Sequence, residues 1–404
     1  MSRFGPGTNA GEIRALVPAP GDVEEHVRGI LADVMARRDT AVRELTARFD
    51  GVEVEQLRVP LDELDAAPTA LEPAVVEGLR IAIANVGAVA EAQLRAPLAV
   101  ELPQGQHVDI LEVPVRRAAA YVPGGRAAYP STVVMCAVTA RTAGVEELAV
   151  CAPPGADGRL HPAILAACSL CGVTEVYAMG GAQAIAALAY GTDSVPAVDV
   201  IVGPGNRYVQ EAKRQLVGVV GIDGVAGPSE LVVVASADAD PGLIAVDLLA
   251  QAEHGPDSLV LAISPARELL DQVEAALGGA ELPLVESPDV PSALALAEQI
   301  APEHLELVGA EAEALADAVR FAGCLFVGHD AGTAFGDYVA GSNHVLPTGG
   351  AARFASALGV STFTRRMSRV SLPPGAAARL ASAGAAVARA EGFPLHAESM
   401  ERRA

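Results

Sequence analysis

The sequence predicts an α/β protein with two lobes, each built around a sheet of parallel-type strands. Short apolar segments alternate with helical segments in two successive series, which is the pattern of βαβ units. Many of these segments end at Gly or Pro, the residues that most often stop strands and helices. Trp is absent and aromatic residues make up only 3% of the chain, so Ala, Val, Leu and Ile must fill the core, as they do when helices cover a buried sheet.

The first series predicts one lobe. Its strands are expected at 147–151, 175–179 and 198–202, and its helices at 162–171, 182–190 and 206–217. The second series predicts the other lobe, with strands at 231–235, 259–263 and 324–327. Asp240 and Pro241 are expected to begin a helix as its N-cap and first helical residue. Amphipathic helices are expected between about residues 23 and 94, and an Ala-rich helical tail after Pro373.

The composition excludes several functional classes. Lys and Arg number 28 against 50 Asp and Glu, and the resulting net charge of −22 lacks the basic field that nucleic acids and anionic membranes attract. No stretch approaches the ~20 unbroken apolar residues of a membrane span, and the first seven residues contain no apolar signal-peptide core. Five cysteines, an odd number, do not suit a disulfide scaffold. We therefore expect a soluble, cytoplasmic protein without nucleic-acid or membrane partners.

Four of the eight histidines lie in polar strings after residue 250. QAEH at 251–254 ends a predicted helix, and Gln251 and His254 share one helix face, which suits a metal bound from one side. A histidine at a helix C-terminus also complements the helix dipole, so this string alone leaves both interpretations open. PEH at 302–304 joins a carboxylate to an imidazole, a pair suited to general-base catalysis. An acidic first turn of a helix fits the same string equally well.

Two further strings are hard to explain by core packing. The glycine-rich segment 336–348 carries Asp337, Asn343 and His344, and a Gly/Pro turn near the end of the chain carries Glu391 and His396. Gln251, His254, Asp337 and His396 together form a nitrogen and oxygen donor set compatible with Zn²⁺.

Three glycine-rich turns lie at or near strand ends in the first lobe: YVPGG at 121–125, MGGAQ at 179–183 and GPGN at 203–206. Strand ends beside helix N-termini bind dinucleotides in open α/β sheets. Each turn alone is ordinary, but three on one sheet edge favour a nucleotide, although Tyr208 stands where G-x-G-x-x-G requires its third glycine. Cys168 and Cys171 form a lone CxxC without nearby metal partners, so we expect free thiols there.

Together these strings resemble the histidinol dehydrogenase family. The matching strings, in the family's order, are RFDG at 48–51, YVPGG at 121–125, GPGN at 203–206, AGPSE at 226–230, QAEH at 251–254, PEH at 302–304, GDY at 336–338, SNHVLPT at 342–348, and EG at 391–392 followed by His396.

The resemblance implies a fold of two incomplete Rossmann-like lobes with a helical N-terminal segment and a helical C-terminal tail. It also implies a homodimer in which the tail is domain-swapped into the partner's active site. We expect the N-terminal segment at 1–20, a metal-binding catalytic lobe at 21–120 and 230–360, an NAD-binding lobe at 121–229, and the tail at 361–404.

The resemblance also implies the site. Zn²⁺, one per subunit, is expected on Gln251, His254, Asp337 and His396, with Glu303 and His304 as catalytic residues. NAD is expected to contact Tyr121, Gln183 and Asn206. The residues expected around the substrate are Ser229, Gln251, His254, His304, Asp337, His344, Glu391 and His396.

The implied reaction is the four-electron oxidation of L-histidinol to L-histidine through bound L-histidinal, a step of histidine biosynthesis that uses NAD twice. Two enzymatic alternatives remain open from the sequence: a related zinc and NAD dehydrogenase acting on another alcohol, and a zinc hydrolase using Glu303 as its base. The three glycine turns disfavour the hydrolase. A homologue that binds without catalysing is disfavoured by the intact Glu303-His304 pair, and the donor set leaves both Zn²⁺ and Mn²⁺ open.

Overall fold

The computed structural model describes residues 3–18, 21–124 and 127–404, which form two compact units. The first unit comprises Met1–Ala92 and Arg116–Phe363, and the second comprises Gln93–Val115 and Thr364–Ala404. The first unit contains both predicted lobes. Each lobe has a parallel sheet, as the alternation of strands and helices predicts.

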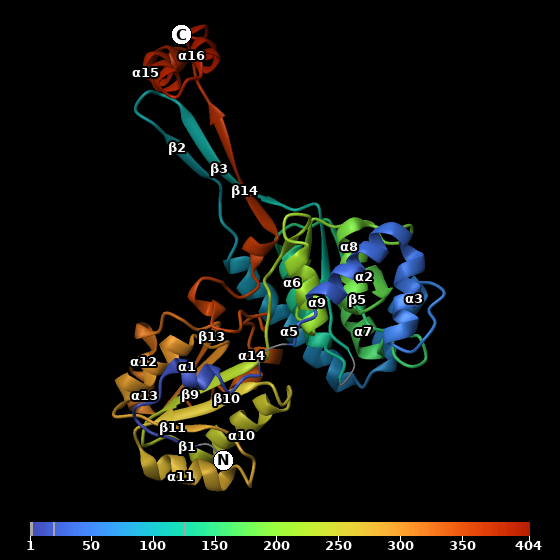
Figure 1. Ribbon diagram of the computed structural model, residues 1–404, viewed down its shortest axis with the longest axis vertical. Helices are drawn as coiled ribbons and strands as arrows, with labels where there is room; N and C mark the ends of the chain where they lie inside the picture. The colour runs from blue at the N-terminus through green and yellow to red at the C-terminus, as the bar shows by residue number, and fades with distance from the viewer. Residues whose placement is uncertain (1–2, 19–20, 125–126) are drawn as a thin grey trace. The chain divides into compact units, whose positions relative to one another are not determined.

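The first lobe contains a five-stranded parallel sheet in the order β6-β5-β4-β7-β8 (Figure 1). The strands are β4 (Arg117–Tyr121), β5 (Glu147–Ala152), β6 (Glu175–Ala178), β7 (Val200–Val202) and β8 (Gly221–Ile222). The helices that follow them are α6 (Pro130–Thr142), α7 (Pro162–Leu170), α8 (Gly181–Tyr190) and α9 (Arg207–Gln215). The central strand β4 is fully buried, and its three alanines let helices approach the sheet closely.

The N-terminal helices also pack on this lobe. They are α2 (Glu24–Arg37), α3 (Asp39–Phe49), α4 (Leu61–Ala66) and α5 (Pro73–Ala92). Helix α2 contacts α8 and α9, α3 contacts α8, α4 contacts α7, and α5 contacts α6. Residues 21–120 were expected in the other lobe, together with residues 230–360. Most of them lie in the first lobe instead, because these helices and the central strand β4 belong to it.

The second lobe contains a six-stranded parallel sheet in the order β1-β11-β10-β9-β12-β13. The strands are β1 (Arg3–Phe4), β9 (Glu230–Ala235), β10 (Leu259–Ser264), β11 (Leu284–Glu286), β12 (His304–Val308) and β13 (Cys324–Val327). Alternate residues of β9 face opposite layers. Val232 and Val234 pack towards α1 (Ala10–Arg14), α12 (Val290–Ile300) and α13 (Ala310–Glu313), whereas Leu231 and Val233 pack towards α10 (Pro241–Ala252) and α11 (Arg267–Ala276).

The second unit combines an antiparallel sheet with a helical hairpin (Figure 1). The sheet has the order β14-β3-β2, from β2 (Leu98–Glu101), β3 (His107–Pro114) and β14 (Thr364–Ser371), and the hairpin consists of α15 (Ala376–Ala390) and α16 (Pro394–Glu401). The expectation of a wholly helical tail from residue 361 is therefore wrong at β14. This strand pairs with β3 over eight residues, and Arg366 and Arg369 form ion pairs with Glu112 and Asp109 across the two strands.

The remaining elements are short. They are the helix α14 (Thr333–Tyr338) and the 3₁₀ turns η1 (Ala67–Ala70), η2 (Ala316–Ala318), η3 (Ala351–Arg353) and η4 (Val360–Thr362). Among the described residues, α5 has the length and apolar composition of a membrane span, properties that core helices of soluble proteins share. Cys168 is buried and Cys171 is half-buried, and both are free thiols, as predicted.

Candidate active site

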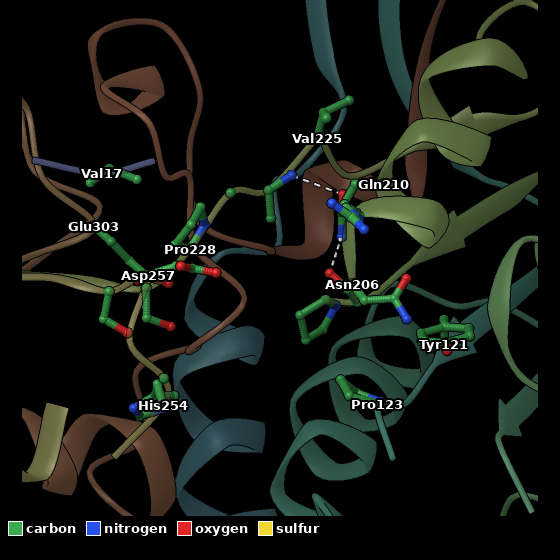
Figure 2. A pocket seen from close by; sticks show the side chains of 18 of the residues that line it. Val17, Tyr121, Pro123, Asn206, Gln210, Val225, Pro228, His254, Asp257 and Glu303 are labelled. Atoms are coloured by element: carbon green, nitrogen blue, oxygen red, sulfur yellow. Dashed lines mark hydrogen bonds between the residues drawn. The ribbon is translucent and has the colours of Figure 1, made fainter. Parts of the chain in front are cut away.

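A cavity of about 1190 Å³ lies between the two lobes of the first unit. Figure 2 shows Tyr121, Pro123 and Asn206 on one side of this cavity, and His254, Asp257 and Glu303 on the other. Of the residues predicted for the site, those that line the cavity are Tyr121, Asn206, Ser229, His254, Glu303, His304, Asp337 and His344. Residues predicted from separate strings to bind cofactor and substrate thus share one cavity.

The cofactor side of the cavity is built at the carboxyl ends of β4 and β7. These strands are neighbours in the sheet, at the point where the strand order reverses and open α/β folds leave a crevice. Tyr121 ends β4, and the turn 203–206 follows β7. Gly203 has φ +108°, and a Cβ there would lie 2.1 Å from the carbonyl oxygen of Tyr121, so only glycine fits this close approach.

The three glycine turns are linked through Tyr121. Its hydroxyl accepts a hydrogen bond of 3.1 Å from the backbone N–H of Gly181, which joins the first turn to the second. Asn206 accepts hydrogen bonds from the N–H groups of Tyr208 and Val209 and so caps α9. Gln183 is buried on α8 and does not line the cavity. Gly125, the last residue of the first turn, lies outside the described residues.

The opposite side of the cavity is built at the amino edge of the other sheet. Ser229 precedes β9, and His304 is the first residue of β12, which pairs with β9. Helix α10 follows β9 and returns towards the amino edge, which brings Gln251 and His254 back to it. Asp337 lies near the end of the short helix α14, at the start of the glycine-rich segment 336–348. The PEH string therefore leads into a strand rather than into a helix.

Glu303 and His304 are both held by the backbone of Glu230. The N–H of Glu230 donates to Oε2 of Glu303 at 2.9 Å, and the carbonyl oxygen of Glu230 lies 2.9 Å from Nδ1 of His304. Because a carbonyl only accepts, Nδ1 carries the proton and Nε2 of His304 is left as the acceptor. That Nε2 lies 3.7 Å from Oδ1 of Asp337.

Burial sets the protonation states of His304, Glu303 and Asp337. Burial, together with nearby His254 and His344, lowers the pKa of His304 to about 4, so His304 is neutral near pH 7. Burial raises the pKa of Glu303 well above its ordinary range, and the carboxylates of Glu230 and Asp337 act in the same direction. Burial also raises the pKa of Asp337 to about 6, which His254 partly opposes. The arrangement combines a neutral imidazole with a carboxyl group of high proton affinity, as general acid–base chemistry requires.

His344 connects the two sides of the cavity. Its Nδ1 donates to the carbonyl oxygen of Asp337 at 2.8 Å, so its Nε2 accepts from Oγ1 of Thr132 at 3.1 Å. Thr132 lies on α6 of the first lobe and is buried. Sequence reasoning missed Thr132 because it sits inside an apolar helical run that carries no motif.

Three of the predicted metal ligands lie in the first unit, and their donor groups fit Zn²⁺. Gln251 is buried with its amide nitrogen unpartnered, and it does not line the cavity. Nδ1 of His254 lies 3.2 Å from the carbonyl oxygen of Gln251, which leaves the other ring nitrogen for a ligand. Within residues 3–18, 21–124 and 127–404, no three His, Cys, Asp or Glu side chains already gather in a metal-binding cluster. His396 and Glu391 belong to the second unit.

Two further residues of the site were missed by sequence reasoning. Glu230 is a buried carboxylate at the first position of β9, and Arg14 at the end of α1 forms an ion pair with it. The sequence does indicate that Glu230 has a partner, since a carboxylate at the start of a buried apolar strand is rarely buried alone. Its partner could not be found, because 216 residues separate the two along the chain.

The two parallel sheets and the cavity with its imidazole–carboxyl pair define an α/β oxidoreductase with a dinucleotide-type crevice. Residues 18–404 match the model of the family described as histidinol dehydrogenase. The chain belongs to the histidinol dehydrogenase family.

Individual relatives agree with this assignment. The chain is 44% identical to the histidinol dehydrogenase of a Synechococcus species, over 94% of this chain and 92% of the relative. It is likewise 44% identical to that of Rhizobium meliloti, over 95% and 92%. A crystal structure of histidinol dehydrogenase from Elizabethkingia anophelis superimposes with a TM-score of 0.93 at 30% identity, over 100% of this chain and 98% of that one.

Proposed function

We propose that this protein oxidises L-histidinol to L-histidine in two successive NAD-dependent steps, with L-histidinal kept in the cavity between them. The observation that carries this proposal is the position of His304, a neutral imidazole held by the carbonyl of Glu230 beside Glu303. His304 faces a cavity that is also lined by two of the glycine turns of the first lobe, those at 121–125 and 203–206. A base facing a dinucleotide crevice suits removal of a hydroxyl proton while a hydride leaves the same carbon.

His304 takes the hydroxyl proton in the first step and again from the hydrated aldehyde in the second. Glu303 takes a proton from water as that water adds to the aldehyde; its raised pKa makes the ionised carboxylate a stronger base than an exposed one. NAD would be held at Tyr121 and Asn206, which line the cavity, with Gln183, buried on α8, as a further expected contact, and it would supply the hydride acceptor. Each step transfers one hydride, so the two steps together account for four electrons and one added water.

Zn²⁺ would be held by Gln251, His254, Asp337 and His396, and it would supply a fixed anchor for the amine and imidazole of the substrate. Ser229, His344 and Glu391 complete the substrate contacts. The free ring nitrogen of His254 and the carboxylate of Asp337, which line the same cavity, support this ligand set. The first lobe acts as the NAD-binding lobe and the second as the metal-binding lobe.

The protein acts as a cytoplasmic homodimer, and the second unit mediates the pairing. The buried residues of α15 and α16 are all alanines: Ala376, Ala381, Ala385, Ala388 and Ala397. Large apolar side chains of this unit are instead exposed: Leu98, Val370, Val387, Phe393 and Leu395. Exposed apolar surface of this extent is typical of a segment that packs against another chain. The tail would then bring Glu391 and His396 to the partner's site.

The deciding experiment counts NADH formed from a limiting amount of L-histidinol. Two NADH per histidinol, together with recovery of L-histidine, support the proposal. One NADH per substrate molecule, or turnover only with other alcohols, would instead indicate a related zinc and NAD dehydrogenase. A zinc hydrolase would form no NADH with any substrate.

A further inference from the structure

The N-terminal helix α1 supplies one charged group to the amino edge of the catalytic sheet. Arg14, the last residue of α1, pairs with the carboxylate of Glu230, whose side chain is only 3% exposed. One guanidinium nitrogen contacts Oε1 of Glu230, and the other donates to Oε2 at 3.2 Å. This two-point pairing fixes the plane of the Glu230 carboxylate, as fork-shaped arginine contacts do.

Arg14 also binds the backbone just before the catalytic pair. The guanidinium nitrogen that donates to Oε2 of Glu230 also donates to the carbonyl oxygen of Ile300 and lies 3.4 Å from that of Ala301. Ala301 has φ +49°, and only one other non-glycine residue in the described parts of the chain has a positive φ. This left-handed conformation is unfavourable for alanine and persists only where surrounding contacts hold it. Arg14 therefore stabilises the strained turn from which residues 302–304 emerge.

The Glu230 side chain, held by Arg14, also binds the backbone of two more segments. Its Oε2 accepts from the backbone N–H of Glu303 at 3.2 Å, and its Oε1 accepts from the N–H of Gly349 at 2.9 Å. Gly349 closely follows the loop that carries His344. Since the backbone of Glu230 separately binds Glu303 and His304, one residue organises the whole catalytic pair.

We propose that Arg14 is a positioning residue for catalysis: through Glu230 and the turn at Ala301 it fixes the directions of the Glu303 carboxylate and the His304 imidazole. Arg14 itself lies outside residues 18–404, which the family model matches, and it does not line the cavity. It acts only through its neighbours. The proposal rests on the proposed function, because it assumes that Glu303 and His304 perform the chemistry.

Arg14→Ala tests the proposal. We expect kcat with L-histidinol to fall by about 10-fold or more, because small displacements of catalytic groups have effects of this size. The Kd of NAD should stay within about twofold, since the cofactor turns lie on the other lobe. Methylguanidinium added at non-denaturing concentration should restore part of kcat by occupying the vacated space. Arg14→Lys should show intermediate activity, because one ammonium cannot make all the contacts of a guanidinium.

The matched control is Arg3→Ala. Arg3 also lies near the N-terminus, and it pairs with Asp271 and Glu274 of the same lobe. Like Arg14, it does not line the cavity. A kcat of Arg14→Ala within twofold of wild type, or a loss equal to that of Arg3→Ala and not restored by methylguanidinium, overturns the proposal. If Arg14→Ala does not fold, Arg14→Lys decides, and wild-type kcat in that variant overturns the proposal. Wild-type protein that forms no NADH from L-histidinol refutes the proposed function instead.

Discussion

Nδ1 of His304 lies 2.9 Å from the backbone carbonyl oxygen of Glu230, and this contact decides how the imidazole can act. The carbonyl accepts the Nδ1 proton, so Nε2 is the basic nitrogen. Burial keeps the ring neutral near pH 7 by lowering the pKa of His304 to about 4. A strand register, in which His304 pairs with Leu231, is therefore what orients the proposed base.

Glu303→Gln should separate the two halves of the reaction. The variant keeps an oxygen that can accept from the N–H of Glu230 but cannot take a proton from water. Oxidation of L-histidinal should therefore slow by about 10²-fold or more, within the usual contribution of a general base, while oxidation of L-histidinol to the aldehyde slows much less. His304→Asn is the matched comparison and should impair both halves. Single-turnover NADH formation from each substrate measures the difference, and normal oxidation of L-histidinal by Glu303→Gln would exclude the role.

The parallel sheets were predictable because their strands are short apolar runs stopped by Gly or Pro. Strands expected at 147–151, 231–235 and 259–263 correspond to β5, β9 and β10. Strand β14 was not predicted, because its sequence TRRMSRVS has no apolar alternation. Its stability depends on pairing with β3, more than 250 residues away, and on ion pairs such as Arg366–Glu112. Contacts of that sequence separation leave no local pattern.

The site was predictable only where polar residues cluster in short strings. Asp337, His344, Glu303 and His304 stand in such strings, and the structure brings them to one cavity. Thr132 was not predictable, because its partner His344 lies on the other lobe and 212 residues away. Whether a buried threonine is structural or part of a site is decided by which element packs opposite it, and the sequence does not contain that information.

Glu306 should make the stability of the protein depend on pH. It is buried on β12, where its Oε1 accepts from the N–H and hydroxyl of Thr333 while its Oε2 has no partner. Burial, assisted by the nearby carboxyl group of Asp247, raises the pKa of Glu306 to about 7. Because the folded state holds the proton more tightly than the unfolded state, the contribution of Glu306 to stability declines as pH rises from about 4.5 to about 7.

Glu306→Gln mimics the protonated carboxyl group and should remove this decline. The variant should match wild type near pH 4.5 and exceed it at pH 8 by on the order of 2–3 kcal/mol. Denaturant unfolding at both pH values measures the effect. Glu286→Gln, which replaces a carboxylate on strand β11, is the control. Its stability relative to wild type should be the same at both pH values. An equal difference in the free energy of unfolding between Glu306→Gln and wild type at both pH values would contradict the expected titration.

Metal removal should abolish turnover, and Zn²⁺ should restore it. His254→Ala should lower the zinc content of purified protein, because it removes the imidazole proposed as a ligand. His329→Ala is the matched control: His329 lies on the same lobe, and its Nε2 accepts from the N–H of Asp240. Metal analysis by mass spectrometry gives a readout independent of activity. Full activity in rigorously metal-free protein would refute the zinc proposal, and recovery with Mn²⁺ alone would change the identity of the metal.

The proposed domain swap of the tail can be tested by mixing two inactive variants. His304→Asn has a defective body and a normal tail, and His396→Ala has the reverse. If the chains are unfolded and refolded together in equal amounts, random pairing makes about half of the dimers mixed. In a swapped dimer, each mixed pair contains one site with a normal body and a normal tail and one site with both defects. About a quarter of all sites should then regain activity, which NADH formation measures against wild-type protein refolded in parallel. A tail that serves its own chain leaves every site with one defect, so activity no higher than that of the separate variants would rule out the swap.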